Sequence, residues 1–489
     1  MKLDTLLASI LEAPADADQI EINNITADSR NVGRGSLFAA LPGSRVDGAR
    51  YVPDALAAGA CAVLTASESD VGEPGVPVIR SNDPRRDLAL LAARFYGRQP
   101  PTIVAVTGTS GKTSVADFAR QMFSALGFQA ASIGTIGVVK PDGNVYGSLT
   151  TPDPVTLHRE LAELADQGVT HLAFEASSHG LDQRRLDGVT ISAAAFTNLG
   201  RDHLDYHPTI EDYFKAKQRL FDTLLAGEGR GARGPGTAVV DIDQPDAATI
   251  IDIAVRRGLP LIRIGRGERA DMRLLEQVPE GFGQRLAITY AGRTHDVSLS
   301  LIGGYQATNA MLAAGLVIAA GGEPGAVFAA MNGLEGVRGR LEVVAEVRGA
   351  MVLVDYAHKP DALAAALAAL RPFVTGRLIC MFGCGGDRDR GKRPLMGRIA
   401  AELADIVIVT DDNPRSENPA AIRAEILAAC PGAMEIGDRF KAIGIAMMQL
   451  TPGDVLLVAG KGHETGQIIG DQVLPFSDHE AVLAVSREI

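Results

Sequence analysis

The sequence predicts an α/β protein with three domains: an N-terminal mixed α/β domain, a central domain on a parallel sheet, and a C-terminal doubly wound domain. Three observations lead to this fold class. The chain has 489 residues, which is more than a single hydrophobic core usually organises. Apolar, β-branched segments alternate with helical patterns over most of its length. Hydrophobic residues make up 46% and charged residues 22%, as in a folded rather than a disordered chain.

The first predicted domain covers residues 1–98. Its sequence mixes short strand-like segments with turns and closes with a helical pattern around Phe95. Pro100 and Pro101 then follow, and two adjacent prolines prevent a helix from continuing. We therefore expect the first domain boundary at residue 98.

The second predicted domain covers residues 99–337. Short β-branched segments alternate here with helical patterns, which favours a parallel sheet with helices on both faces. The expected strands are 103–106, 170–174, 192–197 and 237–240. A stretch rich in Gly and Arg, 227–236, is expected to be a surface loop.

The third predicted domain, 338–489, repeats this alternation and is expected to be doubly wound. Its expected strands are 351–354, 378–382, 406–410 and 455–459. Polar residues follow each of these strands. In open α/β sheets, ligands bind at the carboxyl ends of the strands, so these polar segments are candidate site residues.

The composition argues against several classes of partner. The net charge is -12, aromatic residues make up 5% and Trp is absent, which disfavours a nucleic-acid surface. The four cysteines form no C-x-x-C pair, which argues against zinc and against a disulfide framework. We find neither an N-terminal signal nor an apolar run long enough to span a membrane. We expect a cytoplasmic monomer that binds small molecules, without a membrane span or a nucleic-acid partner.

Residues 107–114, Thr-Gly-Thr-Ser-Gly-Lys-Thr-Ser, predict a phosphate-binding loop between a strand and a helix. The glycines let backbone N–H groups converge on an anion, Lys112 can reach the outer phosphates, and the Thr113 hydroxyl can hold Mg²⁺. Val106 stands where a strict Walker sequence requires glycine, so the loop is a shortened variant. The alternative is an ordinary glycine-rich turn.

Two further segments follow strands of the central domain. Glu175 ends one strand and is a candidate Mg²⁺ ligand; the alternative is a solvated acid at the end of a strand. The segment 198–207 holds two His, two Asp and one Arg, a density typical of a site, although a surface turn would also suit it. Spacing alone does not show which histidine faces inward.

Lys217 interrupts the apolar face of a predicted helix that begins near Ile210. Tyr213, Leu220 and Phe221 share this face with it by helical spacing. In the simplest interpretation the lysine stem packs on the helix and the ammonium reaches water. The other interpretation turns the amine into a site.

The C-terminal domain has four candidate segments: 355–358, 383–393, 411–415 and 460–464. The glycine cluster at 383–386 lacks the G-x-G-x-x-G spacing, and the charges after it suit acidic ligands better than a dinucleotide. Pro414 stiffens a turn that presents Arg415, and an arginine there can hold a carboxylate with two hydrogen bonds. A solvated turn is an equally good explanation of that sequence.

Taken together, six of these segments resemble the Mur ligase family, ATP-dependent enzymes that extend the peptide of the bacterial cell-wall precursor. The resemblance covers nearly the whole chain. It implies a UDP-binding domain at 1–98, an ATP-binding domain at 99–337 and a Rossmann-like, amino-acid-binding domain at 338–489. The segments that carry it are 107–114, 175–180, 198–207, 355–358, 383–393 and 412–415.

The version of the motif at 412–415 is the one associated with meso-diaminopimelate. The resemblance therefore implies that meso-diaminopimelate is joined to the D-glutamate γ-carboxylate of UDP-N-acetylmuramoyl-L-alanyl-D-glutamate through an acyl phosphate, with ATP as co-substrate and Mg²⁺ as cofactor. Three alternatives remain open: a lysine-adding member of the family, a ligase similar to folylpolyglutamate synthetase, and a nucleotide-driven switch protein.

The resemblance also implies roles for single residues. Catalytic roles fall to Lys112, Lys217, Glu175 and His203, with Lys217 carbamylated to N6-carboxylysine and with Thr113, Glu175 and His203 at the metal. ATP binding is implied for Gly108, Thr109, Ser110, Gly111, Lys112, Thr113, Ser114, Asn309, Arg340, Asp355 and His358.

The two other substrates have implied positions as well. Leu149 and Pro152 flank the pair Thr150 and Thr151, which resembles a substrate-binding pair of the family. Some relatives have Asn and Gly at these two flanking positions, so the flanking contacts to the substrate differ here. UDP-muramoyl-dipeptide binding is implied for Ala27, Ser29, Ser44, Arg45, Val46, Thr150, Thr151, Ser177, Gln183 and Arg185. Diaminopimelate binding is implied for Arg388, Asp412, Asn413, Pro414, Arg415, Gly460 and Glu464.

Overall fold

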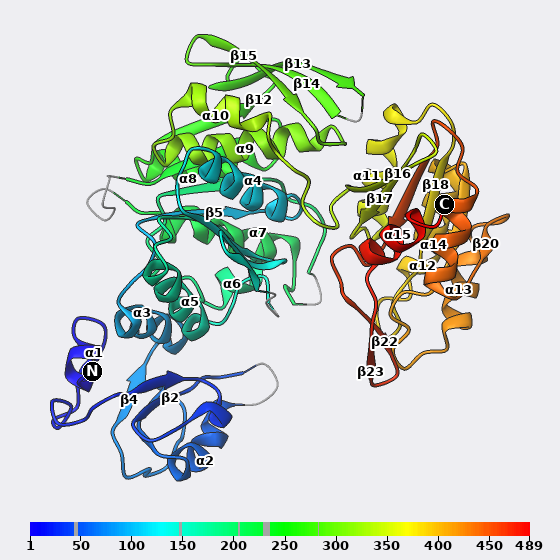
Figure 1. Cartoon of the computed structure of the whole chain (residues 1–489). Coiled ribbons are helices and arrows are strands. Elements are labelled where there is room, and N and C mark those ends of the chain that lie inside the picture. Colours follow the sequence, from blue (N-terminus) through cyan, green and yellow to red (C-terminus); the bar gives the residue numbers. More distant parts are fainter. Residues whose placement is uncertain (44–46, 146–148, 204–205, 228–234, 282) are drawn as a thin grey trace. The chain divides into compact units, whose positions relative to one another are not determined.

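The computed structural model describes residues 1–43, 47–145, 149–203, 206–227, 235–281 and 283–489 (Figure 1). These residues form two compact units, and each is described by itself. The first contains residues 1–270 and 312–324, and the second contains residues 271–311 and 325–489. Among the described helices, none is long and apolar enough to cross a membrane.

The N-terminal part of the first unit is a small parallel sheet with strand order β1-β2-β3-β4. Its strands are β1 (Asn24–Thr26), β2 (Ser36–Ala40), β3 (Ala60–Ala66) and β4 (Val78–Ser81), and its helices are α1 (Leu3–Leu7), α2 (Val52–Ala57) and α3 (Pro84–Tyr96). The Asp83 side chain caps α3, and Gly97, with φ of 70°, ends it. The helix therefore stops before Pro100 and Pro101, as the sequence predicts.

The larger sheet of the first unit has the strand order β12-β11-β10-β5-β9-β6-β7-β8. Its strands are β5 (Thr102–Thr107), β6 (Ala130–Gly134), β7 (Gly137–Lys140), β8 (Gly143–Val145), β9 (His171–Glu175), β10 (Ala193–Phe196), β11 (Thr237–Asp241) and β12 (Leu261–Gly265). The four expected strands are confirmed as β5, β9, β10 and β11. The pairs from β12 to β6 are parallel, as expected, and the two edge strands β7 and β8, which the sequence did not predict, are added antiparallel.

Helices cover this sheet. One face packs its buried side chains on α5 (Pro154–Asp166) and α8 (Ala247–Arg256), while α4 (Lys112–Ala125) contacts β6 and β9. The short α6 (Ser178–Asp182) lies against α7 (Ile210–Arg219). The carboxyl ends of β5, β9 and β10 thereby lie next to one another in the sheet, where ligands bind in open α/β folds.

An antiparallel ribbon opens the second unit. Its strands are β13 (Met272–Glu280), β14 (Gly283–Tyr290) and β15 (Arg293–Leu299). Ala291 and Gly292, with φ of 49° and 77°, connect β14 to β15, and positive φ at both positions is typical of a type I′ hairpin. The sequence prediction did not include this ribbon. Helices α9 (Tyr305–Ala319) and α10 (Pro324–Met331) follow it.

The C-terminal sheet has the strand order β16-β17-β21-β18-β19-β20, with β16 alone antiparallel among its described pairs. Alternate side chains of each strand point to opposite faces: Leu353 and Leu457 toward one core, Val352 and Leu456 toward the other. The doubly wound fold is confirmed, and the four expected strands are β17, β18, β19 and β21. The strands are β16 (Glu342–Val347), β17 (Ala350–Asp355), β18 (Leu378–Phe382), β19 (Ile406–Val409), β20 (Met434–Glu435) and β21 (Val455–Ala459).

Helices lie on both faces of this sheet (Figure 1). The core beneath one face includes α11 (Pro360–Leu370), α12 (Lys392–Leu403) and α13 (Pro419–Leu427). The core beneath the other includes α14 (Arg439–Met448) and α15 (Asp478–Ser486). A hairpin of β22 (Gly466–Ile469) and β23 (Gln472–Pro475) precedes α15.

Candidate active site

The phosphate loop connects β5 to α4, in the order of strand, loop and helix that the sequence predicts. Gly108 has φ of 146°, and a Cβ atom there would lie 1.8 Å from Thr197 Oγ1, so only glycine fits. Gly111, with φ of 87°, precedes α4, and no side chain caps the first turn of this helix. Uncapped N–H groups and the positive end of the helix dipole favour an anion at this position.

Polar contacts tie this loop to the segment after β10. Asn198 Oδ1 accepts a hydrogen bond from Ser110 N at 3.0 Å, and the Asn198 carbonyl accepts one from Thr109 N at 2.9 Å. Lys112 folds back over the loop, where its Nζ donates to the carbonyls of Gly108 at 3.0 Å and Thr109 at 2.9 Å. The structure thus brings together two segments that the sequence singled out separately.

Lys217 lies on α7 with only 1% of its surface exposed. Its Nζ donates to the Gly108 carbonyl at 2.6 Å and lies 4.2 Å from the centre of the Tyr213 ring. Burial, and then the charge of Lys112, hold the pKa of Lys217 well below its ordinary value. The expectation of an ammonium in water was therefore wrong. A neutral amine is the nucleophilic form of lysine, so this environment fits a lysine that reacts with CO₂.

The sequence analysis did not mark Tyr213, which lies beside Lys217, as a site residue. Tyr213 places its hydroxyl 3.2 Å from Thr109 Oγ1, which connects α7 to the phosphate loop. The helix continues into a π-helical turn, Leu220–Leu224, and such turns are frequent at functional sites. Helical spacing did place Tyr213 beside Lys217, but nothing local in the sequence indicates Thr109 as its partner.

Glu175, at the end of β9, is 1% exposed. Its Oε1 accepts from Thr135 N at 2.7 Å and its Oε2 from Thr135 Oγ1 at 3.2 Å. A Cβ atom on Gly134 would lie 2.1 Å from Oε1. The alternative of a solvated acid is therefore wrong. Thr135, which the sequence analysis missed, follows β6 directly, and its place at the carboxyl end of a strand was the available signal.

The two histidines of the loop after β10 differ in burial. The His207 residue is 3% exposed, whereas 41% of the His203 side chain is exposed, with Nε2 at 3.5 Å from Asp202 Oδ2. Within the described residues, no three His, Cys, Asp or Glu side chains form a metal cluster. A carboxylate and a hydroxyl suit Mg²⁺, which takes most of its ligands from phosphate and water, so Thr113 and Glu175 fit that ion chemically. Leu204 and Asp205 lie outside the described residues.

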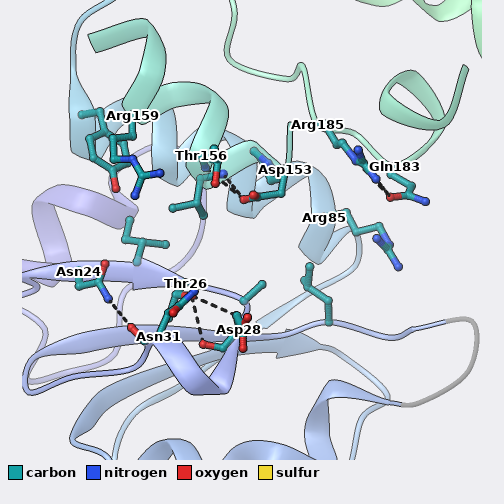
Figure 2. Close-up of a pocket in the computed structure, with 16 residues that line it drawn as sticks. Asn24, Thr26, Asp28, Asn31, Arg85, Asp153, Thr156, Arg159, Gln183 and Arg185 are labelled. Carbon is teal, nitrogen blue, oxygen red and sulfur yellow. Dashed lines mark hydrogen bonds between the residues drawn. The ribbon is translucent and has the colours of Figure 1, made fainter. Parts of the chain in front are cut away.

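A cavity of about 600 Å³ lies within the first unit. Figure 2 shows polar side chains of the N-terminal part, among them Asn24 and Asp28, facing Thr156 and Arg159 of α5 across it. It is lined by Asn24, Ile25, Thr26, Ala27, Asp28, Asn31, Leu41, Arg85, Tyr96, Asp153, Pro154, Val155, Thr156, Arg159, Gln183 and Arg185.

Three of the predicted substrate-binding residues, Ala27, Gln183 and Arg185, line this cavity. Arg185 also donates to the Thr151 carbonyl at 2.5 Å, and Thr151 Oγ1 lies 2.9 Å from Ser177 Oγ. Thr150 Oγ1 lies 3.2 Å from Thr135 Oγ1, which connects this group to Glu175.

The remaining residues of that prediction lie elsewhere. Ser29 begins the turn after β1, next to the lining residue Asp28. Ser44, Arg45 and Val46 fall outside the described residues. Arg85 and Arg159 are lining cations that the sequence analysis missed, because no local motif distinguishes them from other arginines on helices.

In the second unit, the segment after β19 packs against the glycine cluster after β18. Arg415 has φ of 51°, and its Nη1 donates to the Gly386 carbonyl at 2.9 Å. A Cβ atom on Gly385 would lie 2.8 Å from the same nitrogen. Asp412, Asn413 and Pro414 are buried, so the alternative of a solvated turn was wrong. Arg388 is exposed.

The segment after β21 joins this group. Asn413 Nδ2 donates to Glu464 Oε2 at 2.9 Å. A Cβ atom on Gly460 would lie 2.8 Å from Asp412 Oδ2. The structure therefore brings together six of the seven residues predicted to bind diaminopimelate and leaves Arg388 at the surface.

The C-terminal residues predicted to bind ATP lie after β17 and on α9. The Asp355 carboxylate accepts from Leu341 N and Ala357 N, both at 2.7 Å. The Arg340 guanidinium lies 5.0 Å from the centre of the Tyr356 ring. His358 Nδ1 donates to the Tyr356 carbonyl at 2.8 Å, and burial lowers the pKa of His358 to about 4. Asn309 donates to Gln306 Oε1 at 2.9 Å.

Comparison with known proteins covers almost the entire chain. Residues 21–96 match the Mur ligase family, catalytic domain; residues 106–317 match the Mur ligase middle domain; and residues 339–462 match the Mur ligase glutamate ligase domain. Two relatives, from Bradyrhizobium diazoefficiens and Mesorhizobium japonicum, are each 55% identical. They match over 99% and 100% of this chain and 99% of their own, and both are named UDP-N-acetylmuramoyl-L-alanyl-D-glutamate--2,6-diaminopimelate ligase.

Solved structures agree with this assignment. A structure of a UDP-N-acetylmuramoyl-L-alanyl-D-glutamate--2,6-diaminopimelate ligase superposes with a TM-score of 0.75 at 32% identity, covering 100% of this chain and 99% of that one. A Mycobacterium tuberculosis folylpolyglutamate synthase, at 19% identity, has a TM-score of 0.62, covers 77% of this chain and 92% of its own, and shares the fold alone. The chain therefore belongs to the Mur ligase family and has its three-domain α/β fold.

Proposed function

We propose that this protein joins meso-diaminopimelate to the D-glutamate γ-carboxylate of UDP-N-acetylmuramoyl-L-alanyl-D-glutamate, with hydrolysis of ATP to ADP, in the synthesis of the peptidoglycan precursor. One observation carries the proposal. The relatives that match this chain from end to end, at 55% identity, are named as ligases of this substrate and 2,6-diaminopimelate. The buried amine and the phosphate loop of the first unit support the chemistry.

A carboxylate does not form an amide unaided, because its oxygen is a poor leaving group. In the proposed reaction the γ-carboxylate oxygen attacks the γ-phosphorus of ATP, ADP leaves, and an acyl phosphate remains. An amine of diaminopimelate then attacks the acyl carbon, loses a proton, and expels inorganic phosphate. The protein contributes mainly positioning and charge neutralisation.

The residues of the first unit have distinct proposed roles. The uncapped start of α4 and Lys112 bind the phosphates. Mg²⁺ neutralises phosphate charge when it is bound, and Thr113, Glu175 and His203 would hold it. A carbamate on Lys217 would place a negative charge next to the phosphate loop, where burial otherwise favours a neutral amine.

The substrates are assigned by chemistry. The cavity of Figure 2, with the guanidiniums of Arg85, Arg159 and Arg185 in its lining, suits the anionic UDP-muramoyl-dipeptide. Arg415 and Glu464 suit the carboxylate and ammonium groups of an amino acid. Asn309, Arg340, Asp355 and His358 are proposed for ATP.

We place the domain boundaries near residues 98 and 337. The first follows the end of α3, and the second directly precedes the start of the C-terminal family match at residue 339.

The test is ADP release with UDP-muramoyl-dipeptide, measured with and without meso-diaminopimelate. We expect release to depend on both substrates and to yield a tripeptide product of the corresponding mass. Lysine in place of diaminopimelate tests the lysine-adding alternative, and a folate with glutamate tests the folylpolyglutamate alternative. ADP release that ignores all amino acids and yields no amide would contradict the proposal and support a nucleotide-driven switch.

A further inference from the structure

Lys461 is a buried lysine in the second unit that the proposed mechanism does not use. It follows β21, between Gly460 with φ of 116° and Gly462 with φ of 53°. A Cβ atom on Gly462 would lie 2.7 Å from the Cβ of Tyr356, so the backbone is tightly packed here. The Lys461 side chain is 0% exposed. The two glycines therefore allow a turn that directs the lysine inward.

The Lys461 ammonium lies among residues proposed to bind the amino acid. Its Nζ donates to Asn413 Oδ1 and to Glu464 Oε2, each at 3.0 Å. Asp412 Oδ1 lies 3.9 Å away. One cation thus connects the segment after β19 to the segment after β21.

These bonds fix the orientation of the Asn413 amide. An ammonium only donates hydrogen bonds, so the amide oxygen must face Lys461, and Ile468 N donates to the same oxygen at 3.0 Å. The amide nitrogen is then directed to Glu464 Oε2, at 2.9 Å. Asn413, Lys461 and Glu464 form a closed ring of hydrogen bonds.

The ring occupies one oxygen of Glu464 and leaves the other available. Oε2 accepts from both Asn413 and Lys461, whereas no residue in the described part of the chain donates to Oε1. The Glu464 side chain is 32% exposed, so a ligand can reach it. A carboxylate oxygen held in this way is an acceptor for an ammonium.

The other buried cation close by is already paired. The Arg439 guanidinium donates to both oxygens of Asp478, at 2.7 Å each, and to the Ala459 carbonyl at 2.9 Å. Lys461 is therefore the hydrogen-bonded counter-ion of Glu464 within the described residues. Without it, the carboxylates of Asp412 and Glu464 would lose a shared cation in a partly buried site, which is costly.

We propose that Lys461 is a positioning residue for the amino-acid substrate: it holds Glu464 so that Oε1 accepts a hydrogen bond from an ammonium group of the incoming diamino acid. This inference rests on the proposed function. It differs from a purely structural ion pair because it predicts a selective effect on one substrate.

The test compares Lys461→Met, which removes the charge and keeps most of the stem, with Lys441→Met, which changes an exposed lysine of α14. We expect Lys461→Met to raise the KM for meso-diaminopimelate roughly tenfold or more, as the loss of a charge-assisted hydrogen bond does. The KM values for ATP and UDP-muramoyl-dipeptide should stay within about twofold. Equal increases for all three substrates would overturn the inference.

A double-mutant cycle provides the second readout. If Lys461 acts through Glu464, Lys461→Met should add little to the KM effect of Glu464→Gln. Additive effects would overturn the inference. Lys461→Gln keeps a hydrogen-bond donor and should have an intermediate KM; if neither Lys461 variant folds, the role is structural and the inference is wrong. Wild-type protein without diaminopimelate-dependent turnover would instead contradict the proposed function.

Discussion

At the scale of single residues, burial lowers the pKa of Lys217, although the helical pattern of the sequence predicted most simply an ammonium in water. An exposed lysine is charged at neutral pH and does not react with CO₂, whereas the environment of this amine favours the neutral form. The hydrogen bond to the Gly108 carbonyl then fixes the amine beside the phosphate loop. The lowered pKa of the amine and its position beside the loop therefore both follow from its burial against Gly108.

We expect Lys217→Ala to lower the rate of ligation by roughly a hundredfold or more, because it removes the proposed carbamate, a negative charge close to the transferred phosphate. Added bicarbonate should not restore the activity. The measurement is ADP release at saturating substrates, together with the intact mass of the wild-type protein in bicarbonate buffer. Lys215→Ala is the matched control, because Lys215 is an exposed lysine on the same helix. Unchanged turnover in Lys217→Ala would remove this residue from the mechanism.

Arg415 combines an uncommon backbone conformation with an ordered side chain. Its φ of 51° is unusual for a residue with a side chain, and its N–H donates to the Ile468 carbonyl at 3.1 Å. We expect Arg415→Ala to raise the KM for meso-diaminopimelate by roughly tenfold or more and to leave the KM for ATP nearly unchanged. The substitution removes the proposed carboxylate clamp and a bond to the Gly386 carbonyl, but none of the residues proposed for ATP. Steady-state kinetics with each substrate varied in turn is the measurement. Equal losses for both substrates would count against the clamp.

At the scale of secondary-structure elements, four buried strands of each larger sheet could be predicted from sequence, but the exposed ribbon and the buried strand β6 were not predicted. β18 and β21 are continuous runs of apolar residues, and β5 and β9 have apolar centres between polar end residues. Strands of a parallel sheet that is covered on both faces have this pattern. The ribbon from β13 to β15 alternates buried and exposed residues and carries many charges, so it gives no such run.

The site follows the same division. Residues that act within a short motif, such as Lys112 and Arg415, could be identified from sequence. Thr135 could not, because its partner Glu175 is 40 residues away in the chain. Lys461 lies in the candidate segment 460–464, but its hydrogen bond to Asn413, 48 residues away, exists only because of the fold. Burial of Lys217 likewise depends on Gly108, which lies 109 residues earlier.

The packing of β6 against β9 provides a prediction at this scale. A methyl group on Gly134 would occupy the position of Glu175 Oε1, so Gly134→Ala should displace the carboxylate. We expect ligation to fall by at least about tenfold, with an unfolding free energy lower by about 1–3 kcal/mol, as is usual for overpacking. ADP release and urea unfolding measure the two effects. Gly267→Ala is the control, because a methyl group there meets no atom within 4 Å. Equal activity of the two variants would contradict a role for the Glu175 position.

At the scale of the whole molecule, buried histidines couple folding to pH. Burial lowers the pKa values of His158, His358 and His463 to about 4. The ordinary value is 6.5, so the unfolded chain binds more protons than the folded protein between pH 4 and pH 6.5. The contribution of these histidines to the unfolding free energy therefore falls as the pH falls through this window.

We expect the urea midpoint to decrease steadily from pH 7 to pH 4.5, with each fully shifted histidine contributing up to about 3 kcal/mol. His158→Gln, which retains a donor for the Asp187 carbonyl, should show a smaller decrease over the same range. The measurement is equilibrium urea unfolding at several pH values. A variant with the same pH slope as wild type would show that folding does not lower the pKa of His158.

The carbonyl of Gly108 accepts hydrogen bonds from both Lys112 and Lys217, and this has a consequence for nucleotide affinity. The backbone carbonyls of the loop are themselves hydrogen-bond acceptors for the Lys112 ammonium. When the Lys112 ammonium binds a nucleotide phosphate, it gives up its hydrogen bonds to the loop carbonyls. Only the difference in free energy between the new and the old hydrogen bonds contributes to nucleotide binding. Lys112 therefore adds less to nucleotide affinity than an ammonium without other hydrogen-bond partners would add.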